Sequence, residues 1–232
     1  MPPSIRLDEV AVSVSTPSGD LVLLHPTSAQ LTEHRIALIG SNGSGKSTFA
    51  RLLNGLVEPT SGAVTVNGLD TVDDGPAVRR TVGFVFTNPD AQLVMPTCIE
   101  DVALSLRRTI KDKKERLRRA RSILEGIGLE DKADTTVHAL SGGQKQMLAL
   151  AGVLATEPAI LVADEPTTLL DLRNTRAVAD RLFALSQQLV LVTHDLELAA
   201  RCDRALVIDE ARVVFDGAPA DAIEHYRCVV DA

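Results

Sequence analysis

The sequence predicts an α/β fold with a mostly parallel sheet, a small antiparallel β part near the N-terminus and an inserted helical subdomain. Short apolar runs typical of buried strands recur along the chain, at 35–39, 160–163, 189–193 and 205–208. Helical stretches separate several of these runs, and this alternation favours a largely parallel sheet covered on both faces. Between 96 and 155 the apolar period becomes helical over a long segment.

The first part of the chain alternates apolar and polar residues in the manner of half-buried strands. We expect strands at 5–14 and 21–24, separated by a turn at Thr16-Pro17-Ser18-Gly19. Further on, a strand at 35–39 runs into a glycine-rich loop, and 46–55 follows as a helix. The next expected strands are 63–67, which Asn67-Gly68 closes, and 82–86.

The spacing of apolar residues in the helical segment 96–155 predicts which face of a helix is buried. Leu117, Ala120, Leu124 and Ile127 lie at i, i+3, i+7 and i+10, and Gly128 is a plausible helix stop. A later helix is expected at 172–187. We therefore predict a single domain over 1–232, with an α/β core at 1–86 and 156–232 and a helical subdomain at 96–155.

Composition excludes several classes of protein. The 232 residues are 45% hydrophobic and 24% charged, which makes disorder, collagen and coiled coil poor descriptions. The three cysteines (Cys98, Cys202 and Cys228) show no zinc or disulfide spacing and suit a reducing compartment. No apolar run approaches the roughly 18 residues that a membrane-spanning helix needs. We expect any membrane association to depend on partner chains.

Charge is uneven along the chain. The net charge is −7, yet the segment 107–121 holds nine Lys/Arg against Asp112 and Glu115. General nucleic-acid binding needs an extended basic surface, and this chain is acidic outside one basic strip. We therefore do not expect it to bind nucleic acid generally. The strip is interpreted as a solvated helix face, with contact to anionic lipid or to a partner protein as the alternative.

A phosphate-binding loop is predicted directly after the strand at 35–39. The segment 40–47 matches GxxxxGK[ST] at every fixed position, and a helix follows it, as this motif requires. Backbone N–H groups of such a loop converge on phosphate oxygens. Lys46 would reach the β- and γ-phosphates of a bound nucleotide, and Ser47 would ligate Mg²⁺. The loop alone leaves kinases, GTPases and many ATPases open. The predicted nucleotide-binding residues are Gly40, Ser41, Asn42, Gly43, Ser44, Gly45, Lys46, Ser47 and Thr48.

Two carboxylates follow the buried strand at 160–163. Asp164 and Glu165 stand at the carboxyl end of that strand, where open α/β sheets bind ligands. Asp164 fits a role in holding Mg²⁺, directly or through water. Glu165 fits the general base that orients and deprotonates an attacking water.

A second anion site is predicted at 140–144. Ser141 is a good N-cap, Gly142 and Gly143 permit close backbone approach, and a helix follows Gln144. Spacing alone does not say whose phosphate this site meets.

Leu-Ser-Gly-Gly-Gln at 140–144, together with the phosphate loop, resembles the nucleotide-binding subunit of an ABC transporter over nearly the whole chain. The resemblance implies the ABC form of the P-loop NTPase fold, ATP hydrolysis, and two subunits packed head to tail. It also implies that the partner's ATP contacts this chain's signature segment and D-loop, which here are Ser141, Gly142, Gly143, Gln144 and Asp171. His194 matches the switch histidine that contacts the γ-phosphate.

Two positions depart from the family pattern. The loop after Phe86 normally begins with a glutamine that touches Mg²⁺ and couples the site to the membrane partner, and here Thr87 stands there. Gln92 is a candidate substitute. The family's adenine-stacking aromatic is also missing, because Val14 occupies its place. An apolar side chain keeps some contact but loses an aromatic contribution of about 0.5–1.5 kcal/mol.

The segment after Phe86 is similar to the ATPases of energy-coupling-factor importers. The shared features are Asn88-Pro89-Asp90, Gln92 and Glu100-Asp101-Val102, while Thr87 and Met95-Pro96-Thr97 are similar to biotin importers in that group. The resemblance implies a second ATPase subunit, more often identical, a transmembrane coupling protein docked on 87–108, and a small substrate-binding membrane protein. It implies a peripheral position on the cytoplasmic face of the cell membrane and no nucleic acid. Cobalt, nickel and other vitamins stay open as solutes.

Other function classes were weighed against this one. A further type of ABC importer would share every catalytic motif. Non-transport ABC ATPases that act on DNA or ribosomes usually carry long coiled-coil insertions or two ATPase domains, and this chain has neither. A regulatory protein that binds nucleotide without turnover agrees with Thr87 and Val14 but not with intact Lys46, Asp164 and Glu165.

Overall fold

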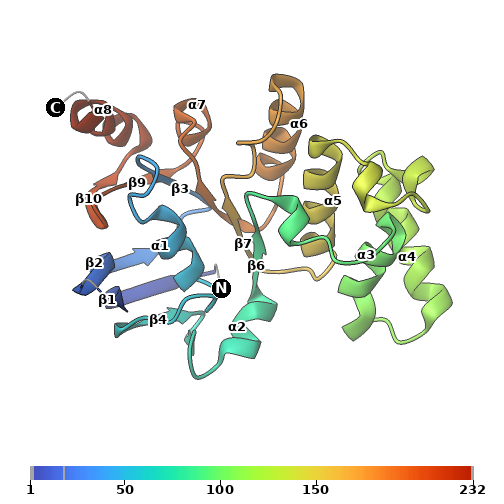
Figure 1. The fold of residues 1–232 in the computed structure, drawn as a ribbon, viewed down its shortest axis with the longest axis horizontal. Coiled ribbons are helices and arrows are strands. Elements are labelled where there is room, and N and C mark those ends of the chain that lie inside the picture. The colour runs from blue at the N-terminus through green and yellow to red at the C-terminus, as the bar shows by residue number, and fades with distance from the viewer. Residues whose placement is uncertain (1–2, 18, 231–232) are drawn as a thin grey trace. The chain divides into compact units, whose positions relative to one another are not determined.

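The computed structural model describes residues 3–17 and 19–230 (Figure 1). Its contacts divide the chain into two compact units. The first unit comprises Met1–Val82, Ala159–Glu165 and Leu185–Ala232. The second comprises Gly83–Pro158 and Pro166–Ala184. Within the described ranges, no helix has the length and apolar character needed to span a membrane.

An antiparallel sheet forms the N-terminal part of the first unit. Its strand order is β2-β1-β4-β5, with β1 at Ile5–Thr16, β2 at Gly19–Leu31, β4 at Ser61–Val66 and β5 at Leu69–Asp70. The predicted turn joins β1 to β2, and Ser18 within it lies outside the described residues. Strand β2 runs well beyond the predicted 21–24, because it pairs with β1 from Gly19 to Leu31.

The central sheet of the first unit confirms the predicted parallel core. Its order is β10-β9-β3-β8-β7, with β3 at Arg35–Ile39, β7 at Ile160–Asp164, β8 at Gln188–Val192, β9 at Arg204–Asp209 and β10 at Arg212–Gly217. Strands β9, β3, β8 and β7 are parallel, and β10 returns antiparallel to β9. Every residue of β3, β7 and β8 is buried, as expected for a sheet covered on both faces.

Helices flank this sheet. Helix α1 (Lys46–Leu52) packs against β7 and β8, α7 (Leu196–Ala199) against β3, and α8 (Pro219–Val230) against β9 and β10. Helix α2 (Gly75–Thr81) lies beside β5. Helix α1 ends earlier than the predicted residue 55, because the chain turns at Gly55 with φ 68°.

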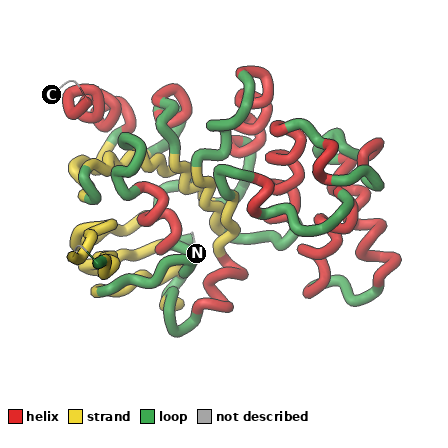
Figure 2. The backbone as a smooth tube through the Cα atoms, viewed as in Figure 1, coloured by secondary structure: helices red, strands yellow, loops and turns green. Residues whose placement is uncertain are grey.

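The second unit is mostly helical, and Figure 2 shows its helices joined by loops. Strand β6 (Val82–Val85) begins at the last residue of the preceding stretch of the first unit. The helices are α3 (Cys98–Ser105), α4 (Lys113–Glu125), α5 (Gly142–Leu154) and α6 (Leu172–Phe183). Single 3₁₀ turns lie at Pro89–Ala91, Leu106–Arg108, Glu130–Lys132 and Val137–Ala139.

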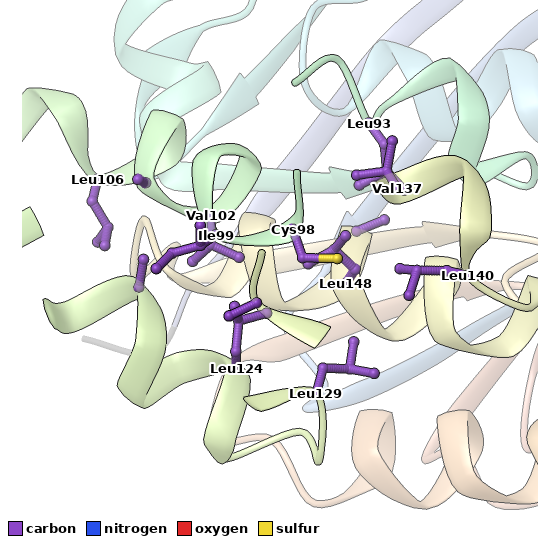
Figure 3. Packing of buried hydrophobic residues seen from close by; sticks show 14 residues of the cluster. Leu93, Cys98, Ile99, Val102, Leu106, Leu124, Leu129, Val137, Leu140 and Leu148 are labelled. Atoms are coloured by element: carbon purple, nitrogen blue, oxygen red, sulfur yellow. The ribbon is translucent and has the colours of Figure 1, made fainter. Parts of the chain in front are cut away.

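A separate apolar core holds the second unit together (Figure 3). Ala120 and Leu124 are fully buried in it, and Leu117 and Ile127 pack at its edge, as the helical spacing predicts. Truncating a buried leucine such as Leu124 to alanine costs about 2–5 kcal/mol. The segment 166–184, which the sequence boundaries leave in the α/β core, groups with this unit because α6 packs against α5.

Candidate functional site

The phosphate loop (residues 40–48) joins the buried strand β3 to the start of α1. Gly40 and Gly45 have φ values of 152° and 106°, a region that residues with a β-carbon rarely enter. A β-carbon at Gly40 would collide with the backbone oxygen of Ile208, and one at Gly45 would lie 2.9 Å from the backbone oxygen of Leu23. The loop is therefore wedged between β2 and β9, and glycine is required for its path.

Lys46 is folded over this loop. Its Nζ donates to the backbone oxygens of Gly40 and Ser41, each at 2.8 Å, and only 5% of the residue is exposed. Burial lowers the pKa of Lys46, while the nearby Glu165 and Asp164 carboxylates act in the opposite direction. A buried ammonium held by neutral carbonyl groups is well placed to meet an anion that enters the loop.

Asp164 ends β7 beside the first turn of α1. The Ser47 hydroxyl donates to Oδ1 of Asp164 at 2.9 Å, and Nη2 of Arg51 lies 3.8 Å from Oδ2. Burial raises the pKa of Asp164, whereas the Ser47 hydrogen bond and Arg51 lower it. A hydroxyl oxygen and a carboxylate oxygen in contact form a donor pair that suits Mg²⁺.

Glu165 and His194 form a pair at the same edge of the sheet. Nδ1 of His194 lies 2.7 Å from Oε2 of Glu165. Glu165 has φ 50°, in the left-handed region, and its backbone N–H donates to the oxygen of Val192 at 3.0 Å. A non-glycine residue held there costs about 1–3 kcal/mol, and such positions cluster at functional sites.

Lys46, Ser47 and Glu165 line a cleft with a volume of about 410 Å³ in the first unit. Its other lining residues come from the phosphate loop, from Ala211 and from β2, where Leu21, Val22 and Leu23 form an aliphatic wall. Val14, which sequence reasoning placed against the base, is not among the described residues that line it. The contribution of β2 was missed, since three adjacent aliphatic residues in a strand carry no signal of a site.

The signature segment (residues 140–144) begins α5 in the second unit. Ser141 and Gln144 form a capping box, in which the Gln144 N–H donates to the Ser141 hydroxyl and the Ser141 N–H donates to Gln144 Oε1. Gly142 is exposed, whereas Gly143 is buried beneath Asn174 of α6. The two glycines therefore have different roles. Gly142 leaves the start of α5 exposed, and Gly143 allows α6 to pack closely against α5.

The D-loop residue Asp171 caps α6 next to this segment. Its carboxylate accepts hydrogen bonds from the backbone N–H and the side-chain amide of Asn174, at 2.8 and 2.9 Å. Because Asn174 also packs on Gly143, it links Asp171 to the signature segment. Sequence reasoning missed Asn174, since no local pattern marks it.

The segment after β6 is tied to α5 as well. The Gln146 side chain, 1% exposed, donates to the backbone oxygen of Phe86, and Lys145 forms an ion pair with Asp90 at 2.7 Å. Thr87 lines a small cavity of about 100 Å³ that Gly142 and Lys145 also line. The Gln92 amide accepts from the N–H of Phe86 and donates to the oxygen of Phe84, so it is engaged with β6.

The basic strip at 107–121 lies mostly on the outer side of α4. Arg118 pairs with Glu115 on the same helix at 2.6 Å, and Arg121 pairs with Asp134 at 3.3 Å. The Glu115–Arg118 pair raises the pKa of Arg118 and lowers that of Glu115. These contacts are those of a solvated helix face, and exposed pairs of this kind contribute little to stability.

Comparison with known proteins assigns a family to this arrangement. Residues 25–168 match the family model described as ABC transporter. A biotin transport ATP-binding protein from Rhizobium etli is 46% identical over 225 residues, which cover 97% of this chain and 98% of that protein. An energy-coupling factor transporter ATP-binding protein from Halalkalibacterium halodurans is 40% identical over 190 residues, covering 80% of this chain and 68% of that protein.

A solved structure gives the same result at the level of the fold. A dimeric ATP-binding cassette in a post-hydrolysis state, bound to ADP and Pi, superimposes with a TM-score of 0.84 and 29% sequence identity. The similarity covers 93% of this chain and 98% of that one.

Proposed function

This chain belongs to the ABC transporter family and is an ATPase of it, and from that premise we propose that it is the energy-coupling subunit of an energy-coupling-factor importer, with biotin as the transported solute. The observation that carries the proposal is the match to a biotin transport ATP-binding protein along nearly the full length of both chains. The match to an energy-coupling factor ATPase supports the same type of importer.

The phosphate loop and Lys46 would hold the triphosphate in the cleft of the first unit. Backbone N–H groups of residues 40–48 and the start of α1 favour negative charge there. The Lys46 ammonium would exchange its two carbonyl partners for phosphate oxygens, a charge-assisted contact stronger than the one it leaves.

Ser47 and Asp164 would hold Mg²⁺ beside the β- and γ-phosphates. The ion supplies charge neutralisation at the oxygens that gain charge during transfer. In the structure the Ser47 hydroxyl donates to Asp164, so the two oxygens already face each other. Arg51 stabilises the carboxylate form of Asp164.

Glu165 would orient a water molecule for attack on the γ-phosphorus. The water oxygen forms a new bond to phosphorus as the bond to the β-phosphate oxygen breaks, and the water proton moves to the Glu165 carboxylate. His194, 2.7 Å from Glu165, would fix the orientation of that carboxylate and contact the γ-phosphate. ADP and phosphate are the products.

A second ATPase subunit completes the site in this proposal. Ser141, Gly142, Gly143 and Gln144, with Asp171, would contact the nucleotide held by the partner subunit. The open start of α5 at Gly142 suits such a contact. Two identical subunits are the favoured arrangement, and ATP would close the dimer that hydrolysis reopens.

The region 87–108 would receive the transmembrane coupling protein at the cytoplasmic face of the membrane. Its ties to α5 through Gln146 and Lys145 connect it to the signature segment within the second unit. Thr87 would take the place of the family's glutamine, offering one shorter oxygen. A small membrane protein would bind the solute.

Purification of the tagged chain from its native membrane, with mass spectrometry of the proteins that copurify, tests this function. We expect one coupling protein and one small hydrophobic protein that carries bound biotin. Labelled biotin uptake should fall to background when Glu165→Gln replaces the native chain. Glu157→Gln is the matched control, because Glu157 is exposed, shares a positive φ of 53° and lies outside the cleft.

Two results would overturn the proposal at different levels. Recovery of two large permease subunits, or of ribosomal or DNA-associated proteins, would reject the importer type and leave the ATPase standing. Recovery of the expected partners with cobalt, nickel or another vitamin bound would reject biotin alone.

A further inference from the structure

The cleft beside the phosphate loop has an aliphatic wall, formed by Leu21, Val22 and Leu23 of β2. Leu21 and Val22 are 55% and 40% exposed, so their methyl groups are accessible to a ligand in the cleft. Since they line the same cavity as Lys46, the remainder of a ligand whose phosphates fill the loop would come to rest against them.

Backbone contacts fix this wall relative to the phosphate loop. Ala211, in the turn between β9 and β10, donates its N–H to the oxygen of Ser44 at 2.9 Å. Its own oxygen accepts from the N–H of His25 at 2.8 Å, so one residue joins the loop to β2. On the other side, Gly45 lies directly beneath the oxygen of Leu23. The distance from phosphate site to wall is therefore set by the fold.

Polar groups and apolar groups are separated within the cleft. The polar side chains among its described lining residues are Asn42, Lys46, Ser47, Thr48 and Glu165, which belong to the phosphate loop or follow β7. Leucine and valine on the wall present only methyl and methylene groups. Among the described lining residues there is no aromatic side chain. The wall side chains can thus pack against the ring of a base, but they form no hydrogen bonds with the polar groups on the edge of that ring.

We propose that this site selects its substrate by the triphosphate and not by the base, so that GTP is bound and hydrolysed as well as ATP, with Leu21 and Val22 as the residues that contact the base. The inference rests on the proposed nucleotide site and extends its substrate class. An aliphatic surface distinguishes ring systems of similar size only weakly, whereas sites that hydrogen-bond a substrate group reject analogues about 10⁴–10⁵-fold. Adenine and guanine differ in their hydrogen-bonding edges and hardly in size.

The test is calorimetric binding of ATP, GTP and inorganic tripolyphosphate to the purified full chain with Mg²⁺, together with phosphate release from both nucleotides. We expect the dissociation constants of ATP and GTP to agree within about tenfold, and both nucleotides to be hydrolysed. Tripolyphosphate should bind more weakly than either, because it makes no contact with the wall.

Substitutions at the wall separate its role from that of the phosphate loop. Leu21→Ala should weaken ATP and GTP alike, about fivefold, and leave tripolyphosphate unchanged. Leu21→Tyr should tighten both, about threefold to tenfold, by adding an aromatic face. Leu56→Ala is the matched control, since Leu56 is a 45% exposed leucine of the first unit outside the cleft.

Either of two results overturns the inference. One is ATP binding with a preference over GTP greater than tenfold. The other is unchanged nucleotide affinity in Leu21→Ala. Both leave ATP hydrolysis and the importer function intact, whereas loss of the proposed function would appear as the absence of the transport partners in the copurification.

Discussion

Gly143 at the start of α5 lies so close to Asn174 of α6 that no β-carbon fits between them. Asn174 is held in that place by Asp171, whose carboxylate accepts two of its hydrogen bonds. The start of the signature helix and the D-loop are therefore parts of one packed cluster in the second unit.

Gly143→Ala should lower the free energy of unfolding by about 1–3 kcal/mol, because the new methyl group overpacks the contact with Asn174. Chemical denaturation measures this. Gly142→Ala is the neighbouring control, since its β-carbon would meet atoms no closer than 3.7 Å. Adding Asn174→Gly to Gly143→Ala should recover part of the loss, because it removes the Asn174 β-carbon that would otherwise lie 2.8 Å from the new methyl group. Equal losses in the single and double variants would contradict the packing argument.

Glu165→Gln should reduce phosphate release about 10²–10⁴-fold while ATP-dependent dimerisation persists. The amide keeps the size and the hydrogen-bonding reach of the carboxylate toward His194 but does not accept a proton from water. Phosphate release and size-exclusion chromatography with ATP are the two measurements. Hydrolysis at the wild-type rate would remove Glu165 from the role of base.

Lys46→Met should abolish ATP binding and leave the ligand-free protein as stable as before, or more stable. Burial lowers the pKa of Lys46, which means that the folded protein bears a cost for the charged ammonium. Methionine fills a similar volume without that charge, although two hydrogen bonds to the loop are lost. Thermal unfolding with and without Mg-ATP decides this, and a marked fall in the ligand-free melting temperature would be the contrary result.

The Cys202 thiol should make folding stability depend on pH in the alkaline range. Burial raises the pKa of Cys202 from 9.0 to about 12, so the unfolded chain loses this proton first as pH rises. The stability is complete below pH 9 and declines between there and about pH 12. From about pH 8 to about pH 10, wild type should lose about 1 kcal/mol more than Cys202→Ala.

Urea unfolding at the two pH values measures that difference. Cys228→Ala is the control, since Cys228 is exposed and should follow wild type. Parallel pH dependence in wild type and Cys202→Ala would contradict the effect of burial.

Contiguous motifs made much of the site predictable from sequence. The phosphate loop, Asp164-Glu165 and the N-cap at Ser141 each lie within a few residues, and their local geometry follows from glycine placement, strand ends and N-cap chemistry. The aliphatic wall and Asn174 were missed for the opposite reason. Their role comes from what the fold places beside them, which no local pattern records.

The secondary structure also divides into elements that local patterns predict and elements that they do not. Strand β3 was predicted to the residue, and β7, β8 and β9 to within one residue at each end, because their apolar runs are too short for a helix. Helix α2 was missed, since its seven residues begin with Gly75-Pro76 and bury little beyond Val78. Helix α6 ends at Phe183 and not at the predicted residue 187. In the segment that follows, Arg35 donates to the backbone oxygens of Leu185 and Gln187, so these two carbonyl groups have partners outside a helix.

The strand order of the central sheet has a consequence for biosynthesis. Strand β3 emerges early from the ribosome, yet its neighbours in the sheet, β8 and β9, are translated about 150 residues later. Until β8 and β9 are synthesised, both edges of β3 lack a paired strand. Contacts between segments so far apart in the sequence also form slowly. Exposed apolar strand edges invite aggregation, so the nascent chain needs shielding during this interval.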